Sequence, residues 1–135
     1  MRELGIKKQI LSIGTIAQPN VIKQAGESLE GAIFTTTEFS SDTPKTETAR
    51  RFIEKYLSKY NKLPNYFSAF SYDSILIIAE AIKKGSYTSK NIREELLKIK
   101  NFHGVSGMIT IKSNGDADFP MVIKIIKNGR IEDVK

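Results

Sequence analysis

The chain has 135 residues, of which 40% are hydrophobic and 27% are charged. This composition is typical of a globular protein, and a chain of this length buries roughly two-thirds of its unfolded surface. The absence of cysteine excludes disulfides and thiolate metal sites. The net charge of +6 arises from basic residues spread along the chain as pairs, mostly among aliphatic residues, which favours a solvated surface over a nucleic-acid patch.

The beginning of the chain predicts a strand, a short helix and a second strand. Residues 9–13 form an apolar run that predicts a buried strand, and residues 31–37 are rich in β-branched residues. Residues 19–26 open with a proline and close with a glycine, as short helices do. This order predicts a parallel βαβ unit. Because ligands of parallel sheets bind at the carboxyl ends of the strands, we expect a site at residues 12–15 and 36–39.

An amphipathic helix is predicted over residues 46–59, because apolar residues recur there at helical spacing and charged residues fill the opposite face. Thr43 is its predicted N-cap, with Pro44 at the first helical position. Residues 61–65 are predicted to form a turn, in which Pro64 prevents the helix from continuing.

Residues 68–85 are the most apolar stretch and predict a helix that is buried nearly all round. Ser71 or Asp73 is the predicted cap of its first turn. The stretch is too short for a membrane span, and acidic residues interrupt it.

A third helix is predicted from Thr88 or Ser89 through Lys98. Residues 102–107 then form a predicted loop punctuated by glycines. Strands are predicted over residues 108–111, 121–126 and 130–134. The Asn-Gly pairs at 114–115 and 128–129 predict hairpin turns.

Residues suited to catalysis or metal binding are few. His103 is the only histidine, no serine lies in a nucleophile-elbow motif, and the glycines form no nucleotide-binding motif. Asp116 and Asp118 lie beside Asn114, as in a calcium loop, but the glycine and glutamate positions of an EF-hand are not met. We therefore favour a hairpin turn there, and we expect no enzyme activity, no cofactor and no metal site.

Two places could instead line a small-molecule cleft. Gly14 and Thr15 follow the first predicted strand, and Phe67, with its neighbours Tyr66 and Ser68, precedes the apolar helix. Each place has a simpler interpretation. The first fits a β-turn, and the second fits a hydrophobic staple that packs Phe67 onto the helix.

Several short motifs occur in an order that is similar to one protein family. They are Leu4-Gly5-Ile-Lys, Ala25-Gly-Glu-Ser-Leu-Glu-Gly31, Tyr72-Asp73, Ala79-x-Ala81-Ile82, Phe102-x-Gly104-x-x-Gly107-x-Ile109, Asn114-Gly115-Asp116 and Lys127-Asn-Gly129. In this order the chain resembles the carboxyl-terminal part of type I periplasmic binding proteins, in particular the leucine/isoleucine/valine-binding proteins of ABC importers.

The resemblance implies an α/β fold that is part of a three-layer αβα architecture, with two lobes joined by hinge crossovers, here incomplete. Residues 1–38 would be a portion of the second lobe, residues 39–120 the returning portion of the first lobe, and residues 121–135 the crossover and terminal strands. The hinge strands would include residues 35–39 and 121–123.

The resemblance also implies a binding site and a function. Gly14 and Thr15 would face the cleft, and Phe67 would offer an apolar wall to the ligand side chain. Relatives that bind aliphatic amino acids often hold the ligand ammonium with a carboxylate after the first of these strands, and this chain has none between Ser12 and Gln18. The implied ligand is a branched-chain amino acid or a related small polar molecule, delivered to the membrane permease of an ABC importer.

Expectations about partners and location follow from the same resemblance. Missing partner surfaces would leave apolar area exposed, so we expect this chain to self-associate, as in a homodimer with exchanged elements. We expect the full-length protein to be periplasmic or extracellular and membrane-anchored, with no export signal in residues 1–6 of this chain. One alternative is the ligand-sensing region of a receptor or regulator with the same fold, and another is a basic nucleic-acid or protein-interaction module; we favour neither, and we expect no nucleic acid as a partner.

Overall fold

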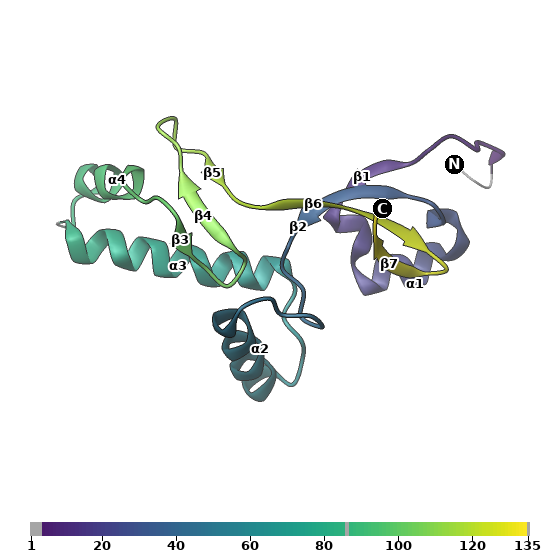
Figure 1. The fold of residues 1–135 in the computed structure, drawn as a ribbon, viewed down its shortest axis with the longest axis horizontal. Coiled ribbons are helices and arrows are strands. Elements are labelled where there is room, and N and C mark those ends of the chain that lie inside the picture. The colour runs from purple at the N-terminus through teal and green to yellow at the C-terminus, as the bar shows by residue number, and fades with distance from the viewer. Residues whose placement is uncertain (1–3, 86, 135) are drawn as a thin grey trace. The chain divides into compact units, whose positions relative to one another are not determined.

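The computed structural model describes residues 4–85 and 87–134, which form two compact units. The first unit combines the described residues up to Thr37 with those from Met121 onward, and the second unit spans Glu38–Pro120. The chain therefore leaves the first unit after Thr37 and returns to it after Pro120 (Figure 1).

The first unit is built on a sheet of order β1-β2-β6-β7. Its strands are β1 (Leu11–Ile13), β2 (Ile33–Thr37), β6 (Met121–Lys127) and β7 (Arg130–Asp133). β1 and β2 are parallel, and the other pairs are antiparallel. The connection from β1 to β2 consists of the 3-10 helix η2 (Gly14–Ala17), α1 (Pro19–Ala25) and the 3-10 helix η3 (Gly26–Leu29). The predicted parallel βαβ unit is thus confirmed.

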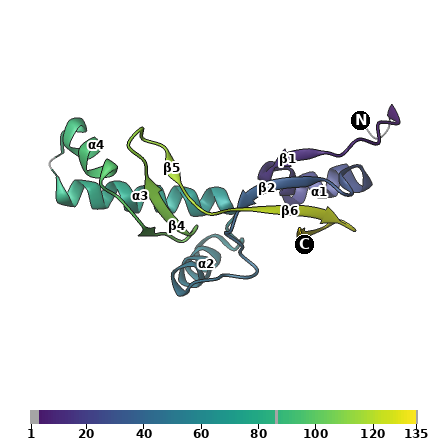
Figure 2. The same ribbon diagram turned by 45° about the horizontal axis from the view of Figure 1, so that its top comes forward.

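One face of this sheet carries the core of the first unit. Ala32, Phe34 and Ile126 are buried there, and partly buried side chains from η2, α1 and η3 pack against them. Figure 2 shows α1 beside the strands that it covers. Strand side chains alternate between the two faces of a sheet, so Phe34 and Ile126 face the helical connection, and the apolar residues of that connection pack on them.

The opposite face of the sheet is aliphatic and exposed. Leu11 and Ile13 of β1 are 74% and 61% exposed, and Met121 and Ile123 of β6 are also exposed. The registers Ile13↔Thr35 and Thr35↔Ile123 place these side chains on one face. The prediction of a buried first strand is therefore wrong for Leu11 and Ile13, whereas Ile10, just before β1, packs against the core.

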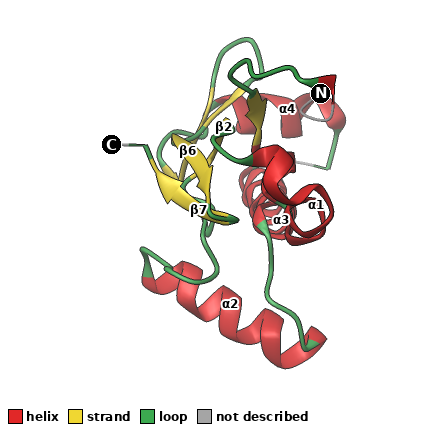
Figure 3. Ribbon diagram, turned by 90° about the vertical axis from the view of Figure 1, so that its right-hand side faces the viewer, coloured by secondary structure: helices red, strands yellow, loops and turns green. Residues whose placement is uncertain are grey.

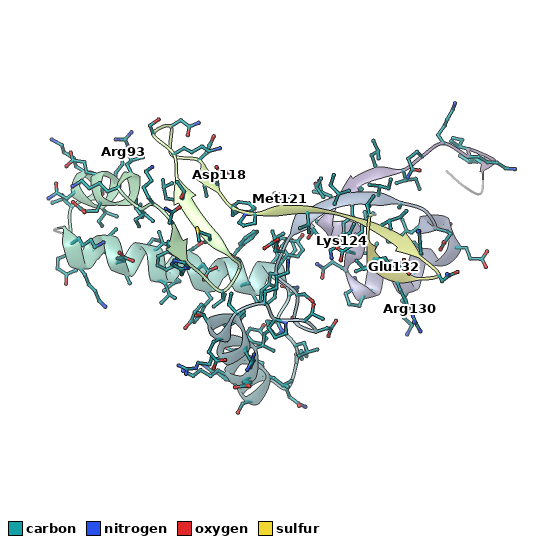
Figure 4. The ribbon with its side chains drawn as sticks, viewed as in Figure 1. Arg93, Asp118, Met121, Lys124, Arg130 and Glu132 are labelled. Carbon is teal, nitrogen blue, oxygen red and sulfur yellow. The ribbon has the colours of Figure 1, made fainter. Side chains whose placement is uncertain are left out.

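The hairpin between β6 and β7 has the turn that its sequence predicts. Asn128 and Gly129 have φ angles of 49° and 69°, as a two-residue hairpin turn requires. Lys124 of β6 forms an ion pair with Asp133 of β7, and Figure 4 labels Lys124, Arg130 and Glu132 along this hairpin.

The second unit contains helices, drawn red in Figure 3, and a small antiparallel sheet of order β3-β4-β5, whose strands Figure 1 labels. The elements are α2 (Glu47–Tyr60), α3 (Tyr66–Lys84), α4 (Ser89–Leu97), β3 (Phe102–His103), β4 (Met108–Ile111) and β5 (Ala117–Asp118). The third predicted helix and the Asn114-Gly115 hairpin are confirmed, and of the two predicted starts, Thr88 and Ser89, the N-cap is Thr88. The short strands β3 and β5 were not predicted.

The first helix of this unit begins later than predicted. Thr46, not Thr43, is the N-cap of α2, and its Oγ1 accepts a hydrogen bond of 3.1 Å from the amide of Ala49. Pro44 lies outside the helix. Glu47 then stands in the first turn, where its carboxylate pairs with Arg50 and Arg51, an arrangement that the helix dipole favours.

The cap of α3 also differs from the prediction. Asn65 holds this position, and its Oδ1 accepts a hydrogen bond of 3.1 Å from the amide of Ser68. Ser71 and Asp73 instead lie inside the helix. A turn that ends in asparagine suits an N-cap because the short amide side chain reaches the free amides of the first turn.

Burial of α3 is one-sided, contrary to the prediction of a helix buried all round. The buried residues form a stripe with a spacing of four: Ala69, Asp73, Ile77 and Ala81. On other faces Ile75 is 67% exposed, and Leu76 and Ile78 are exposed as well. Within the described ranges, no helix is long and apolar enough to cross a membrane.

Candidate functional site

The ends of β1 and β2 meet as the βαβ pattern predicts. Gly14 is buried at the start of η2, and a Cβ atom placed on it would lie 2.8 Å from Thr36 Oγ1 and 3.2 Å from Thr36 Cβ. Only a glycine lets the turn approach β2 this closely. Thr15 follows with its side chain exposed. The β-turn interpretation is replaced by a turn of 3-10 helix.

A further polar residue lies at the end of β2. The hydroxyl of Thr37 is buried and has no hydrogen-bond partner among the described residues. A buried hydroxyl without a partner is costly. Thr37 lies within residues 36–39, where a site is predicted at the carboxyl end of the second strand, although that prediction does not name Thr37 individually.

Phe67 belongs to the second unit, in the first turn of α3. Its side chain is 50% exposed, and its ring centroid lies 4.1 Å from that of Tyr66. A hydrophobic staple requires the residue before the N-cap, and Phe67 lies after the cap Asn65. The staple interpretation is therefore wrong, and the half-exposed ring of Phe67 is accessible for contact with a ligand.

Burial raises the pKa of the Tyr66 phenol above its usual value of 10.0. The phenol beside Phe67 therefore remains protonated at neutral pH and keeps its ability to donate a hydrogen bond.

The other candidates for chemistry are dispersed. His103 is exposed in β3, opposite Met108. Asn114 and Asp116 bond to each other within their turn, with Asn114 Nδ2 donating to Asp116 Oδ2 at 2.7 Å, which supports the hairpin interpretation over a calcium loop. Over the ranges 4–85 and 87–134, no group of three or more His, Asp or Glu side chains is placed to hold a metal ion.

A buried carboxylate in the second unit was missed as an organising residue. Asp73 is 1% exposed. Its oxygens accept hydrogen bonds from the amides of Val105 and Ser106, at 2.8 and 2.9 Å, and from Ser106 Oγ, at 2.6 Å. The sequence offered Asp73 only as a helix cap, because its partners lie more than thirty positions away, at separations of 32 and 33 residues.

An aromatic cavity of about 600 Å³ also lies in the second unit. Its lining comes from α2 and α3 and consists of Phe52, Lys55, Tyr56, Lys59, Tyr60, Ser68, Ser71 and Tyr72. Gly14, Thr15 and Phe67 do not line it.

The chain matches the model of one protein family, and it is similar to several solved structures. The family is described as periplasmic binding protein, and the match covers residues 1–130. A comparison with curated protein sequences gave no match.

The solved structures include proteins with bound amino acids. The leucine binding protein LivK from Thermotoga maritima is 36% identical, with a TM-score of 0.82 over 99% of this chain and 38% of that one. LivJ from Streptococcus pneumoniae, a branched-chain amino acid transporter substrate binding protein in complex with isoleucine, is 29% identical, with a TM-score of 0.77 over 97% of this chain and 37% of that one.

A third structure is more distant and shows the fold alone. It is an ABC transporter substrate-binding protein from Desulfitobacterium hafniense in complex with leucine, 22% identical, with a TM-score of 0.68 over 98% of this chain and 45% of that one. The chain thus spans less than half the length of each of these proteins. The family match and the 36% identity to a leucine binding protein show that this chain belongs to the periplasmic binding protein family and forms part of the type I fold.

Proposed function

We propose that this chain is a carboxyl-terminal part of the solute-binding component of an ABC importer, with a branched-chain amino acid or a related small polar molecule as its ligand. The observation that carries the proposal is the 36% identity, over 99% of the chain, to a protein named as a leucine binding protein. A structure named as a complex with isoleucine supports the same ligand class. In this role the protein binds a solute and catalyses no reaction.

The lobes of such a protein correspond to the units of this chain. In the proposal, residues 1–38 belong to the second lobe, residues 39–120 to the first lobe, and residues 121–135 cross back. The passage of the chain between its units after Thr37 and after Pro120 supports this division. Residues 35–39 and 121–123 would act as hinge strands, so that the ligand closes one lobe over the other.

The ligand would contact residues of both lobes. Gly14 and Thr15 would present backbone and hydroxyl groups at the end of β1. The hydroxyl of Thr37, which bonds to no group in the described part of the chain, lies at the end of the neighbouring strand. The half-exposed ring of Phe67 would contact the aliphatic side chain of the ligand. Because residues 12–18 contain no carboxylate, the ligand ammonium would need another partner, or the ligand would lack an ammonium.

In this function the loaded protein delivers its ligand to the permease of the importer, outside the cytoplasmic membrane. The full-length protein would therefore be periplasmic, or extracellular and anchored to the membrane. The family and the transporter names of the similar structures support this location.

Self-association of the 135-residue chain is a separate part of the proposal. Aliphatic side chains are exposed both on the sheet of the first unit, at Leu11 and Ile13, and on α3, at Ile75 and Ile78. Exposed apolar side chains that gather in large patches are uncommon on monomers. A second copy would cover it.

Isothermal titration calorimetry on the gene product that contains this chain tests the ligand. The panel is L-leucine, L-isoleucine and L-valine, with the corresponding 2-oxo acids as probes that lack the ammonium. We expect at least one of them to bind with a dissociation constant of about 1 μM or tighter. Absence of binding across the panel would contradict the proposal.

Replacement of Phe67 tests the site. Phe67→Ala should weaken binding about tenfold, because the ligand loses an apolar contact. The matched control is Tyr87→Ala, since Tyr87 is an aromatic residue of the same unit that is 87% exposed. Equal affinities of the Phe67→Ala variant and the unmodified protein would remove Phe67 from the site.

A further inference from the structure

The buried carboxylate of Asp73 holds a closed loop, residues 104–107. The loop is closed by a hydrogen bond of 2.9 Å from the Gly104 amide to the Gly107 carbonyl. The consecutive amides of Val105 and Ser106 point to the carboxylate, together with Ser106 Oγ. Consecutive backbone amides form a concave site for anions, so Asp73 fixes the backbone of the loop and not only one side chain.

The position of Gly104 leaves no room for a side chain beside the Asp73 carboxylate. A Cβ atom on Gly104 would lie 2.5 Å from Asp73 Oδ2, 2.7 Å from Cγ and 2.9 Å from Oδ1. These distances are too short for any side chain. The glycine is therefore required by the close approach of the carboxylate.

The loop lies against both segments that lead to the other unit. Val105 belongs to the core cluster of Phe52 and Ala69, and Phe39 packs against this cluster. Phe39 is the second residue after the chain enters the second unit. A small cavity of about 50 Å³ is lined by Glu38, Phe39, Val105 and Gly107, among others.

The last residue of the same loop, Gly107, lies beside the segment through which the chain leaves the second unit. A Cβ atom on Gly107 would lie 3.4 Å from Cδ of Pro120, the last residue of the second unit. Gly107 has a φ angle of 125°, which a side chain would strain. One loop therefore supports the chain just after it enters the second unit and just before it leaves.

The carboxylate has no cationic partner among the described residues, and its hydrogen-bond donors, the two loop amides and Ser106 Oγ, are uncharged. Burial of a charge that only neutral groups compensate is unfavourable compared with an apolar residue of the same shape. A buried network that is fully satisfied confers a defined geometry in return. The hydrogen bonds of Asp73 therefore suit a loop whose backbone must keep one position, as we infer for residues 104–107.

We propose that Asp73 and Gly104 are positioning residues for ligand binding, which fix the 104–107 loop and through it the two hinge segments. The inference rests on the proposed function, in which closure about these segments brings the lobes onto the ligand. A loosened loop lets the lobes sample more orientations, so a smaller fraction of the protein is competent to close, and the apparent affinity falls by that fraction.

The test uses the gene product that contains this chain, with L-isoleucine as the probe. Asp73→Asn turns an amide NH₂ toward the loop amides, and Gly104→Ala places a methyl group in the carboxylate. Both should lower the affinity about tenfold or more, measured well below the melting temperature. Both should also reduce the ligand-induced decrease in the radius of gyration measured by small-angle X-ray scattering. Ser106→Ala, which removes one hydrogen bond, should give a smaller loss in the same direction and serves if the stronger variants do not fold.

The matched control is Ile77→Val. Ile77 is buried in the other core cluster of the second unit, with Ile99 and Ile109, so this change should lower the melting temperature while leaving affinity and contraction as in the unmodified protein. A purely structural role for Asp73 would give the same pattern for Asp73→Asn, and that result would overturn the inference alone. If the unmodified protein does not bind isoleucine, the same measurements use the member of the panel above that it does bind. Failure to bind any member of that panel would overturn this inference through the function on which it rests.

A double variant checks the contact itself. In an Asp73→Ala background, Gly104→Ala should cost little further affinity, because the atoms that it would meet have gone. Additive losses in the two variants would contradict the steric argument.

Discussion

At Gly14 a single hydrogen atom in place of a side chain decides how closely two strand ends approach. Gly14→Ala would place its methyl group 2.8 Å from Thr36 Oγ1, and because Thr36 is held in β2 by its pairing with Val122 of β6, the turn must move away. We expect a loss of about 1–3 kcal/mol in the free energy of unfolding, measured by urea denaturation.

The matched double variant separates this steric effect from a change in backbone freedom. Combination of Gly14→Ala with Thr36→Ala removes the hydroxyl that the new methyl group meets, so the two losses should be less than additive. Strict additivity would show that the cost of Gly14→Ala arises elsewhere.

At the scale of elements, the start of α2 shows that only one of two nearby candidate residues serves as the N-cap. Thr43 and Thr46 are three positions apart, and only Thr46 accepts a hydrogen bond from the helix, at 3.1 Å from the Ala49 amide. Thr46→Ala should therefore destabilise the chain by about 1 kcal/mol.

Thr43→Ala is the control for that change, since the hydrogen bonds of Thr43 to other described residues reach only Ser40, in an exposed segment. It should cost less than about 0.5 kcal/mol. Thermal unfolding followed by circular dichroism measures both values, and the reverse order would show that α2 begins at Thr43.

At the scale of the whole molecule, the exposed aliphatic surfaces predict association. Size-exclusion chromatography with light scattering should give a mass about twice the 15.2 kDa of one chain. Ile75→Glu places a charge on the exposed side of α3 and should shift the mass toward that of one chain. Thr48→Glu, at an exposed and polar position of α2, is the control that should leave the mass unchanged. A monomer at all concentrations for the unmodified chain would contradict the proposal.

The candidate site was predictable only in the part that local rules govern. Parallel pairing of residues 9–13 with 31–37 was enough to bring Gly14 close to Thr36, because consecutive strands of a βαβ unit end at the same edge. The roles of Asp73 and Gly104 were not predictable, since their contact joins residues 31 positions apart in the sequence that no local pattern connects.

Short-range patterns are enough to predict the amphipathic α2, the start of α4 at Thr88 or Ser89 and the Asn128-Gly129 hairpin, because side-chain spacing or backbone conformation within a few residues sets each of them. The folded structure is needed to show which threonine caps α2, which side of α3 is covered, and that Asp73 bonds to a distant loop. Those outcomes depend on which surfaces meet. The hydrophobic effect is non-directional, so the apolar side chains of Ile75 and Leu11 indicate that a surface favours burial but not which other surface covers it.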